Sequence, residues 1–277
     1  MKKLKVSIVM TESHFGKIEE NLDNTRKWAE KAKKVNAQIV CFPELNITGY
    51  ALSEKNNRYS EIIPGRITSE IEKISKSSDM TVIAGMVEKT TLGETITQVV
   101  ISPEGMLGKY QKIHLSPAEK KFFVPGKEIS LFSWKNFKFG IGLCFDAHFP
   151  EFSTICSLKG ADVIFFPHAS PPHESARQKR DRWLRYLPAR SYDNSVFVAA
   201  CNQVGTNNEG IKFNGTAMIL NPKGEIIAEK FGNREDIVSA ELDMKSLEQV
   251  RTSRMGYFLK ERVPELYTDI SKTNDQA

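Results

Sequence analysis

The stretch 140–146, Gly-Ile-Gly-Leu-Cys-Phe-Asp, is an apolar run that ends on Cys144 and is followed by Phe-Pro-Glu at 149–151. The run predicts a buried strand with the thiol at its carboxyl end. Open α/β sheets place reactive groups outside the carboxyl ends of their strands, where N–H groups of the following turn are free. Cys144 is therefore a candidate nucleophile, although a free cysteine taken alone is more often a small buried hydrophobic residue.

Two other segments carry unusual polar groups. Glu44 ends the apolar run 39–44, and a glycine-containing turn at 45–50 follows, so this carboxylate also lies at a strand end. In segment 108–115, period-2 alternation places Lys112 on one face with Tyr110 and His114. By itself Lys112 is typical of an exposed lysine.

Together the three segments resemble the signature blocks of the nitrilase superfamily, the carbon–nitrogen hydrolases. The blocks are 42–44 with 49–50, 112–115 with Glu119 and 123–126, and 142–146 with 149–151. They occur in the family's order and near its spacing, and further matches at 189–198, 202–205 and 264–267 extend the resemblance over nearly the whole chain. The resemblance implies a four-layer α-β-β-α sandwich and a single carbon–nitrogen hydrolase domain over 1–277.

The resemblance places the family's Glu-Lys-Cys triad on Glu44, Lys112 and Cys144, and its second active-site glutamate on Glu119. Each assignment is chemically reasonable, because a thiol is mostly protonated at neutral pH and needs a base. Glu44 would take that proton, while Lys112 and the N–H of Phe145 would stabilise the oxyanion. Glu119 would orient the lysine or bind the substrate nitrogen. Two carboxylates in one closed pocket repel, so one is expected to titrate above its ordinary value.

The residues after the thiol favour an amide or N-carbamoyl substrate over a nitrile. True nitrilases usually have Trp-Glu there, whereas Phe145-Asp146 resembles the amidase and carbamoylase branches. His148, a candidate pocket residue, stands where the family's amidases often carry arginine. The predicted reaction is hydrolysis of a small amide through a cysteine acyl-enzyme, with release of ammonia and no cofactor. Nitrile hydrolysis and acyl transfer to an amine remain alternatives on the same fold.

The loop after strand 162–166 supplies two further candidates for the border of the pocket, His168 and Ser170. The loop leaves a strand end as Cys144 does, but a hydrogen-bonded structural histidine is an equal alternative for His168. A metal site of His168 with His173 is disfavoured, because no third ligand lies at suitable spacing. No metal is therefore expected.

A basic run forms the main rival feature; its members are Arg177, Lys179, Arg180, Arg182, Arg185 and Arg190. With a formal net charge of +5, a nucleic-acid-binding module is the alternative class of protein. Acidic residues interrupt the run, an apolar face accompanies it and no nucleic-acid motif is present, which favours a solvated helix face and no nucleic-acid partner. Arg177 or Arg180 could also bind a substrate carboxylate.

The composition is that of a globular α/β protein. Its 277 residues are 40% hydrophobic, no linker divides them, and no run has the length of a signal or membrane-spanning segment, so a cytoplasmic protein without a membrane partner is predicted. The four cysteines form no CxxC pair, which predicts reduced thiols.

Alternating patterns predict strands at 4–10, 38–42, 80–87, 95–101, 106–113, 138–143, 162–166, 196–201, 215–221, 225–230 and 236–241. Helices are predicted at 18–32, 67–78, 149–159 and 175–193, and from Asp243. The alternation indicates an α/β sheet covered by helices. The family resemblance also implies a homodimer or larger homo-oligomer, with helices 149–159 and 175–193 at the interface.

Overall fold

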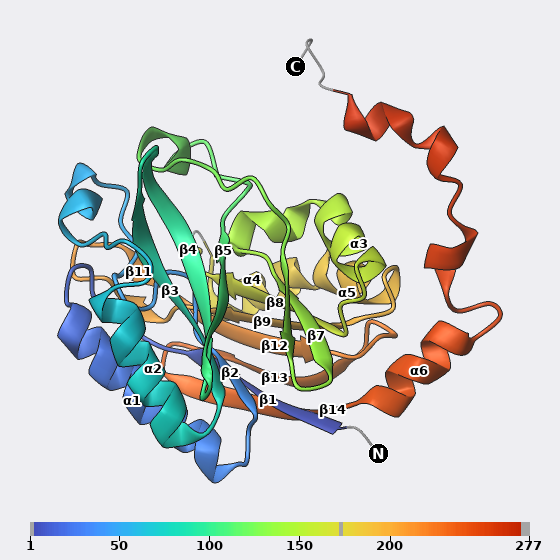
Figure 1. The fold of residues 1–277 in the computed structure, drawn as a ribbon, viewed down its shortest axis with the longest axis horizontal. Coiled ribbons are helices and arrows are strands. Elements are labelled where there is room, and N and C mark those ends of the chain that lie inside the picture. Colours follow the sequence, from blue (N-terminus) through green and yellow to red (C-terminus); the bar gives the residue numbers. More distant parts are fainter. Residues whose placement is uncertain (1–2, 172–173, 273–277) are drawn as a thin grey trace.

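Two six-stranded sheets pack face to face in the computed structural model, which describes residues 3–171 and 174–272 (Figure 1). The first sheet has the order β14-β1-β2-β3-β4-β5 and the second β13-β12-β9-β8-β7-β6. The strands of the first are β1 (Lys3–Met10), β2 (Ile39–Cys41), β3 (Thr81–Thr90), β4 (Gly93–Ser102), β5 (Gly105–Gln111) and β14 (Asp236–Asp243). Those of the second are β6 (Leu131–Trp134), β7 (Phe137–Ile141), β8 (Val163–His168), β9 (Phe197–Asn202), β12 (Gly215–Leu220) and β13 (Ile226–Gly232). A short hairpin pairs β10 (Gly205–Thr206) with β11 (Lys212–Phe213).

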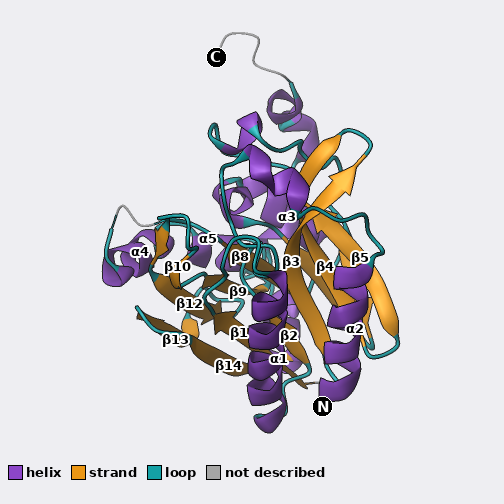
Figure 2. Ribbon diagram, turned by 90° about the vertical axis from the view of Figure 1, so that its left-hand side faces the viewer, coloured by secondary structure: helices purple, strands orange, loops and turns teal. Residues whose placement is uncertain are grey.

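Helices cover the outer faces of both sheets (Figure 2). The first sheet carries α1 (Ile18–Lys34) and α2 (Arg66–Ser78), and the second carries α3 (Pro150–Leu158), α4 (Ala176–Trp183) and α5 (Leu187–Tyr192). Strand β1 shows why the layers form: Leu4, Val6 and Ile8 join the core between the sheets, whereas Val9 joins the core under α1 and α2. Successive side chains of a strand point to opposite faces, so a strand buried on both faces serves two cores. The predicted α-β-β-α sandwich is confirmed.

The two sheets share a plan that brings strand ends together. In the first, β1, β2 and β3 are parallel; in the second, β7, β8 and β9 are parallel. Antiparallel strands flank each parallel core, including β14 against β1. The carboxyl ends of parallel strands meet at one edge of a sheet, where open α/β folds build their sites.

The predicted elements agree with the structure except at a few places. The helix predicted at 175–193 is two helices, because Pro188 lies in the first turn of α5 and proline is tolerated there but not inside a helix. The strand predicted at 106–113 ends at Gln111, which leaves Lys112 in the turn after it. Strand β6 and the hairpin β10–β11 were not predicted.

The chain continues after β14 into α6 (Met244–Thr252) and then into three short 3-10 turns, η4 (Phe258–Glu261), η5 (Pro264–Leu266) and η6 (Thr268–Ser271). These form an arc along the outside of the molecule, drawn in red in Figure 1. Large apolar side chains of the arc are exposed, with Met255 at 83% and Leu266 at 73%. Among the described helices, none combines the length and apolarity that crossing a bilayer requires.

Candidate active site

Three strand ends supply the predicted triad. Glu44 follows β2, Lys112 follows β5, and Cys144 begins the 3-10 turn η3 (Cys144–His148) just after β7. Two of these strands belong to the first sheet and one to the second, so the groups meet across the sandwich. Lys112 is fully buried, whereas its local sequence alone is typical of an exposed lysine.

Lys112 lies between two carboxylates. Its Nζ donates to Glu44 Oε1 at 2.7 Å and to Glu119 Oε1 at 2.8 Å, and all three side chains are buried. Burial opposes the charge on Lys112, but Glu44, Cys144 and Glu119 raise its pKa well above the ordinary value. The ammonium is therefore charged across the physiological pH range.

Neighbouring donors fix the two carboxylates. Ala169 N–H donates to Glu44 Oε2 at 2.9 Å, and Ser116 N–H donates to Glu119 Oε2 at 2.8 Å. The hydroxyl of Tyr50 adds a bond of 3.2 Å to Glu119. Each carboxylate thus has one oxygen on Lys112 and the other on a backbone amide, which leaves little freedom of rotation.

Burial raises the pKa of Glu44 to about 7; Glu119 adds to the rise, while Lys112 opposes it. This agrees with the expectation that one carboxylate of the pair titrates high. Burial also raises the pKa of the Cys144 thiol to about 12, with Glu44 raising it further and Lys112 lowering it. The resting thiol is therefore protonated, and it needs a base to become a nucleophile. Glu44 has the pKa that a general base at neutral pH requires.

Cys144 occupies a turn of unusual geometry. Its φ of 45° lies in the left-handed region, which is uncommon for residues other than glycine and recurs at active sites. The side chain is half-buried and so remains in reach of solvent. The next residue, Phe145, is also half-buried and packs edge-on against Phe149.

Asp146 holds this turn, a role that the sequence reasoning missed. Its fully buried carboxylate accepts from Leu143 N–H at 2.7 Å, His114 N–H at 2.9 Å and the Tyr110 hydroxyl at 2.8 Å. The available signal was its place two residues after the thiol and the alternation that put Tyr110 and His114 on one face. Asp146 therefore joins the turn of the candidate nucleophile to the segment that carries Lys112.

Arg190 supports the same turn from α5. It is buried, and it donates to Ala147 O at 2.9 Å and to His148 O at 3.0 Å. The imidazole of His148 is exposed and lies beside the ring of Tyr186, with centroids 4.5 Å apart. His148 thus stands at the outer side of η3.

The loop after β8 lies against Glu44. Ala169 contacts Glu44, and Ser170 N–H donates to Asn202 Oδ1 at 2.8 Å. His168 is buried with Nδ1 bonded to Phe166 O at 2.8 Å, and burial lowers its pKa well below the ordinary value, so the ring is neutral. His173 lies outside the described residues, and within them no cluster of His, Cys, Asp or Glu is suited to hold a metal.

The basic run does not form a solvated face, so that prediction was wrong. Lys179 and Arg190 are buried, Arg180 pairs through two bonds of 2.9 Å with Glu229, and Arg182 pairs with Glu174 at 2.8 Å. The paired Arg180 cannot serve as the predicted carboxylate ligand, because its guanidinium already binds one. Arg177 and Arg185 are exposed.

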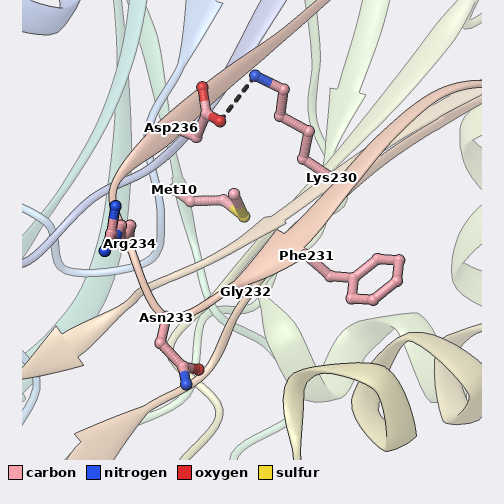
Figure 3. A pocket seen from close by; sticks show the side chains of 7 residues that line it. All are labelled: Met10, Lys230, Phe231, Gly232, Asn233, Arg234 and Asp236. Atoms are coloured by element: carbon pink, nitrogen blue, oxygen red, sulfur yellow. Dashed lines mark hydrogen bonds and ion pairs between the residues drawn. The ribbon is translucent and has the colours of Figure 1, made fainter.

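A separate surface hollow of about 570 Å³ lies at the turn between β13 and β14 (Figure 3). Met10, Phe231 and Arg234 are among its lining residues, and Lys230 pairs with Asp236 at 2.7 Å on its rim. None of the triad residues lines it. The hollow is therefore separate from the candidate active site.

Comparison with known proteins identifies the class. Residues 5–252 match the model of the carbon-nitrogen hydrolase family. A sandwich that gathers a thiol, two carboxylates and an ammonium at its strand ends is that of a thiol-dependent hydrolase of carbon–nitrogen bonds. The chain belongs to this family, the nitrilase superfamily, and it is an enzyme that hydrolyses amides.

Individual relatives are consistent with this family assignment. The chain is 31% identical to a nitrilase of Pyrococcus abyssi, over 95% of this chain and 99% of that protein. It is 32% identical to a 2-oxoglutaramate amidase of Bacillus subtilis, over 90% and 94% of the two chains. The fold resembles an amidase from Nesterenkonia AN1 with a TM-score of 0.83 at 22% identity, over 96% and 97%. It also resembles Saccharomyces cerevisiae Nit3 with a TM-score of 0.81 at 24% identity, over 92% and 95%.

Proposed function

We propose that this enzyme releases ammonia from a small linear amide, with Cys144 as nucleophile, Glu44 as general base and acid, and Lys112 as the cation of the oxyanion site. The observation that carries the proposal is the buried Lys112 ammonium held at 2.7 and 2.8 Å between Glu44 and Glu119, beside a half-buried thiol. Glu119 orients Lys112 in this scheme. Phe145 contributes its N–H as a second donor to the oxyanion.

The first half-reaction forms a thioester. The sulfur bonds to the amide carbon as its proton passes to Glu44, and the carbonyl oxygen becomes an oxyanion beside Lys112. The carbon–nitrogen bond then breaks, and Glu44 returns the proton to the departing nitrogen as ammonia leaves. In the second half-reaction Glu44 takes a proton from water, whose oxygen attacks the thioester carbon. The carbon–sulfur bond breaks, the thiol regains its proton, and a carboxylic acid is released.

Amides and N-carbamoyl compounds are the proposed substrates. Relatives named amidase, omega-amidase and 2-oxoglutaramate amidase support the amide, and one relative is named nitrilase. Solved structures of the Nesterenkonia amidase include a complex with butyramide and an adduct of acrylamide at that enzyme's active-site cysteine. His148, His168, Ser170 and Arg177 remain proposed pocket residues.

The test is an ammonia-release screen over amides, ureido acids and nitriles, with intact-protein mass spectrometry to detect the acyl adduct. Cys144→Ala is expected to abolish turnover and adduct while the circular dichroism spectrum is unchanged. Cys41→Ala, which removes a fully buried thiol of the core, is the matched control. An adduct on Cys41 or Cys201 would refute the assignment, and transfer of the acyl group to an added amine in preference to water would replace hydrolysis by acyl transfer.

We further propose that 1–277 forms one catalytic domain that acts in the cytoplasm as a homodimer or larger assembly. The pairing of β14 with β1 supports one domain, since it joins distant parts of the chain in one sheet. The exposed apolar side chains of Ile155 and Leu158 on α3 and of Tyr192 on α5 support association through these helices. Light scattering after size-exclusion chromatography tests it, and a monomer at micromolar concentration would contradict it.

A further inference from the structure

Lys179 is a buried cation that the catalytic scheme does not use. Its side chain is fully buried, and within residues 3–171 and 174–272 no carboxylate lies within ion-pair distance of its Nζ. The nearby carboxylate of Glu174 pairs with Arg182 instead, at 2.8 Å. Lys179 is also the fourth residue of α4, in the first turn, where the helix dipole disfavours a positive charge. A buried cation in this position is costly, so its retention calls for an explanation.

The Lys179 ammonium holds Ser170, in the loop after β8. Its Nζ donates to Ser170 O at 2.6 Å and to Ser170 Oγ at 3.2 Å. Asn202, at the end of β9, holds the same residue, because its Oδ1 accepts from Ser170 N–H at 2.8 Å and its Nδ2 donates to Ser170 O at 3.3 Å. Four hydrogen bonds therefore fix Ser170, although this loop residue is only half-buried.

The fixed loop residue adjoins the partner of the candidate general base. Ala169 directly precedes Ser170, and its N–H donates to Glu44 Oε2 at 2.9 Å. This hydrogen bond lowers the pKa of Glu44, against the larger rise that burial causes. The backbone has only two free dihedral angles per residue, so fixing Ser170 restricts the direction of the Ala169 N–H. The contacts thus form one path from the Lys179 ammonium through the loop to Glu44.

We propose that Lys179 is a positioning residue for Glu44, whose bonds to Ser170 hold the loop so that the N–H of Ala169 meets the carboxylate of the general base. This inference rests on the proposed function, because it assigns Lys179 to the same reaction. In this scheme Lys179 touches neither the substrate nor the reacting atoms and acts only through the loop. Removing its side chain should therefore weaken the bond between Ala169 and Glu44 and raise the pKa of Glu44.

The pH profile of Lys179→Met tests the proposal, with butyramide as substrate because a neutral amide adds no charge of its own. In the wild type, kcat/KM should rise with pH through about 7. A hydrogen bond to a charged group corresponds to about one to two pKa units. Lys179→Met should therefore move the rise upward by about one unit, which lowers kcat/KM about 10-fold at pH 6 and leaves it nearly unchanged at pH 9. Lys76→Met, which removes an exposed lysine of α2, is the matched control and should keep the wild-type profile.

Other titratable groups surround both ends of this path. Those whose charges interact with Glu44 are Lys112, Glu119, Cys144 and Tyr50, and those that interact with Lys179 are Cys144, Glu174, Arg182 and His168. None of these side chains is changed in Lys179→Met. Burial lowers the pKa of Lys179 to about 8, but a neutral amine still carries two N–H donors, so the wild type keeps its bonds to Ser170 above that pH.

Asn202→Leu separates the hold on the loop from the charge of the lysine. The substitution removes two of the four hydrogen bonds to Ser170, keeps a side chain of similar size and changes no charge. If the position of the loop sets the pKa of Glu44, the rise of kcat/KM with pH should move upward in this variant as well. If Lys179 acted on Glu44 only through its charge, the profile of Asn202→Leu would match that of the wild type.

The outcomes separate this inference from the proposed function. A Lys179→Met profile that is unchanged, or lower by the same factor at every pH, would show that the lysine does not position Glu44 and would overturn the inference. A wild-type profile in Asn202→Leu would overturn it too. Adduct formation in intact-protein mass spectrometry reports that each variant is folded, and should Asn202→Leu form no adduct, the Lys179→Met profile alone decides. A wild type that releases no ammonia from any amide and forms no adduct would overturn the proposed function itself.

Discussion

Glu44→Gln tests the role of the high-pKa carboxylate in both activity and stability. The substitution keeps the shape of the side chain but removes the base, so we expect kcat/KM to fall by about 10²- to 10⁴-fold, the usual contribution of general acid–base catalysis. In the wild type, kcat/KM should rise with pH through about 7 as Glu44 loses its proton. The variant should lack that rise.

The same pKa predicts a stability effect whose sign can be worked out. In the folded state the pKa of Glu44 is about 7, against an ordinary value of 4.5, so between these pH values the folded protein binds more protons than the unfolded chain. The free energy of unfolding therefore decreases as pH rises through this window. A difference of about 2.5 pKa units corresponds to about 3 kcal/mol.

Urea denaturation of both proteins at pH 4.5, 6 and 8 measures this effect, because titrations shared by the two cancel in the difference. Relative to Glu44→Gln, the free energy of unfolding of the wild type should fall by about 3 kcal/mol between pH 4.5 and pH 8. Glu72→Gln makes the same chemical change on an exposed residue of α2. The difference in free energy of unfolding between the wild type and this variant should therefore not change with pH. A pH-independent difference for Glu44→Gln would refute the assignment of the raised pKa to this residue.

Three further substitutions test the surroundings of the site. Lys112→Met leaves two buried carboxylates without their cation, so it should lower the free energy of unfolding in urea by about 3–5 kcal/mol at pH 8 and should abolish turnover. The loss should be smaller at pH 5, where Glu44 is protonated; equal losses at both pH values would contradict this. Asp146→Asn changes a carboxylate that accepts hydrogen bonds from three donors, so it should lower the free energy of unfolding by about 1–3 kcal/mol and lower kcat for butyramide. An unchanged kcat would show that Asp146 does not position the thiol. Gly142→Ala would place a Cβ 2.7 Å from a ring carbon of Phe152, so thermal denaturation should show that the free energy of unfolding falls by about 1–3 kcal/mol. Gly232→Ala, with open space around it, should show little change. Equal changes in the two variants would contradict the packing argument.

Much of the fold could be predicted because its strands are short apolar runs that end in polar residues. The runs before Glu44 and Cys144 each form a strand that ends three residues before the candidate catalytic residue, as the pattern indicated. Lys112 could be placed only by resemblance to a family, since the alternation around it is the same for an exposed strand. Its burial between two carboxylates depends on contacts 7 and 68 residues away along the chain.

The segment 175–193 shows where the sequence was insufficient. A run of six basic residues with an apolar face is typical of a solvated helix, and local periodicity cannot reveal which charges meet an acidic partner on another element. Arg180 meets Glu229 from β13, whereas Lys179 turns inward without one. The helix break before Pro188 could have been predicted from the sequence, because proline is disfavoured inside a helix.

The pairing of β1 with β14 has a consequence for the order in which the protein is made. Residues 3–10 pair antiparallel with residues 236–243, more than 220 positions later, so a ribosome-bound chain exposes that edge of the sheet until its synthesis is nearly complete. Contacts of such high sequence separation slow folding. An unpaired apolar edge strand is also a template for aggregation, which makes chaperone supply during translation a determinant of yield for this enzyme.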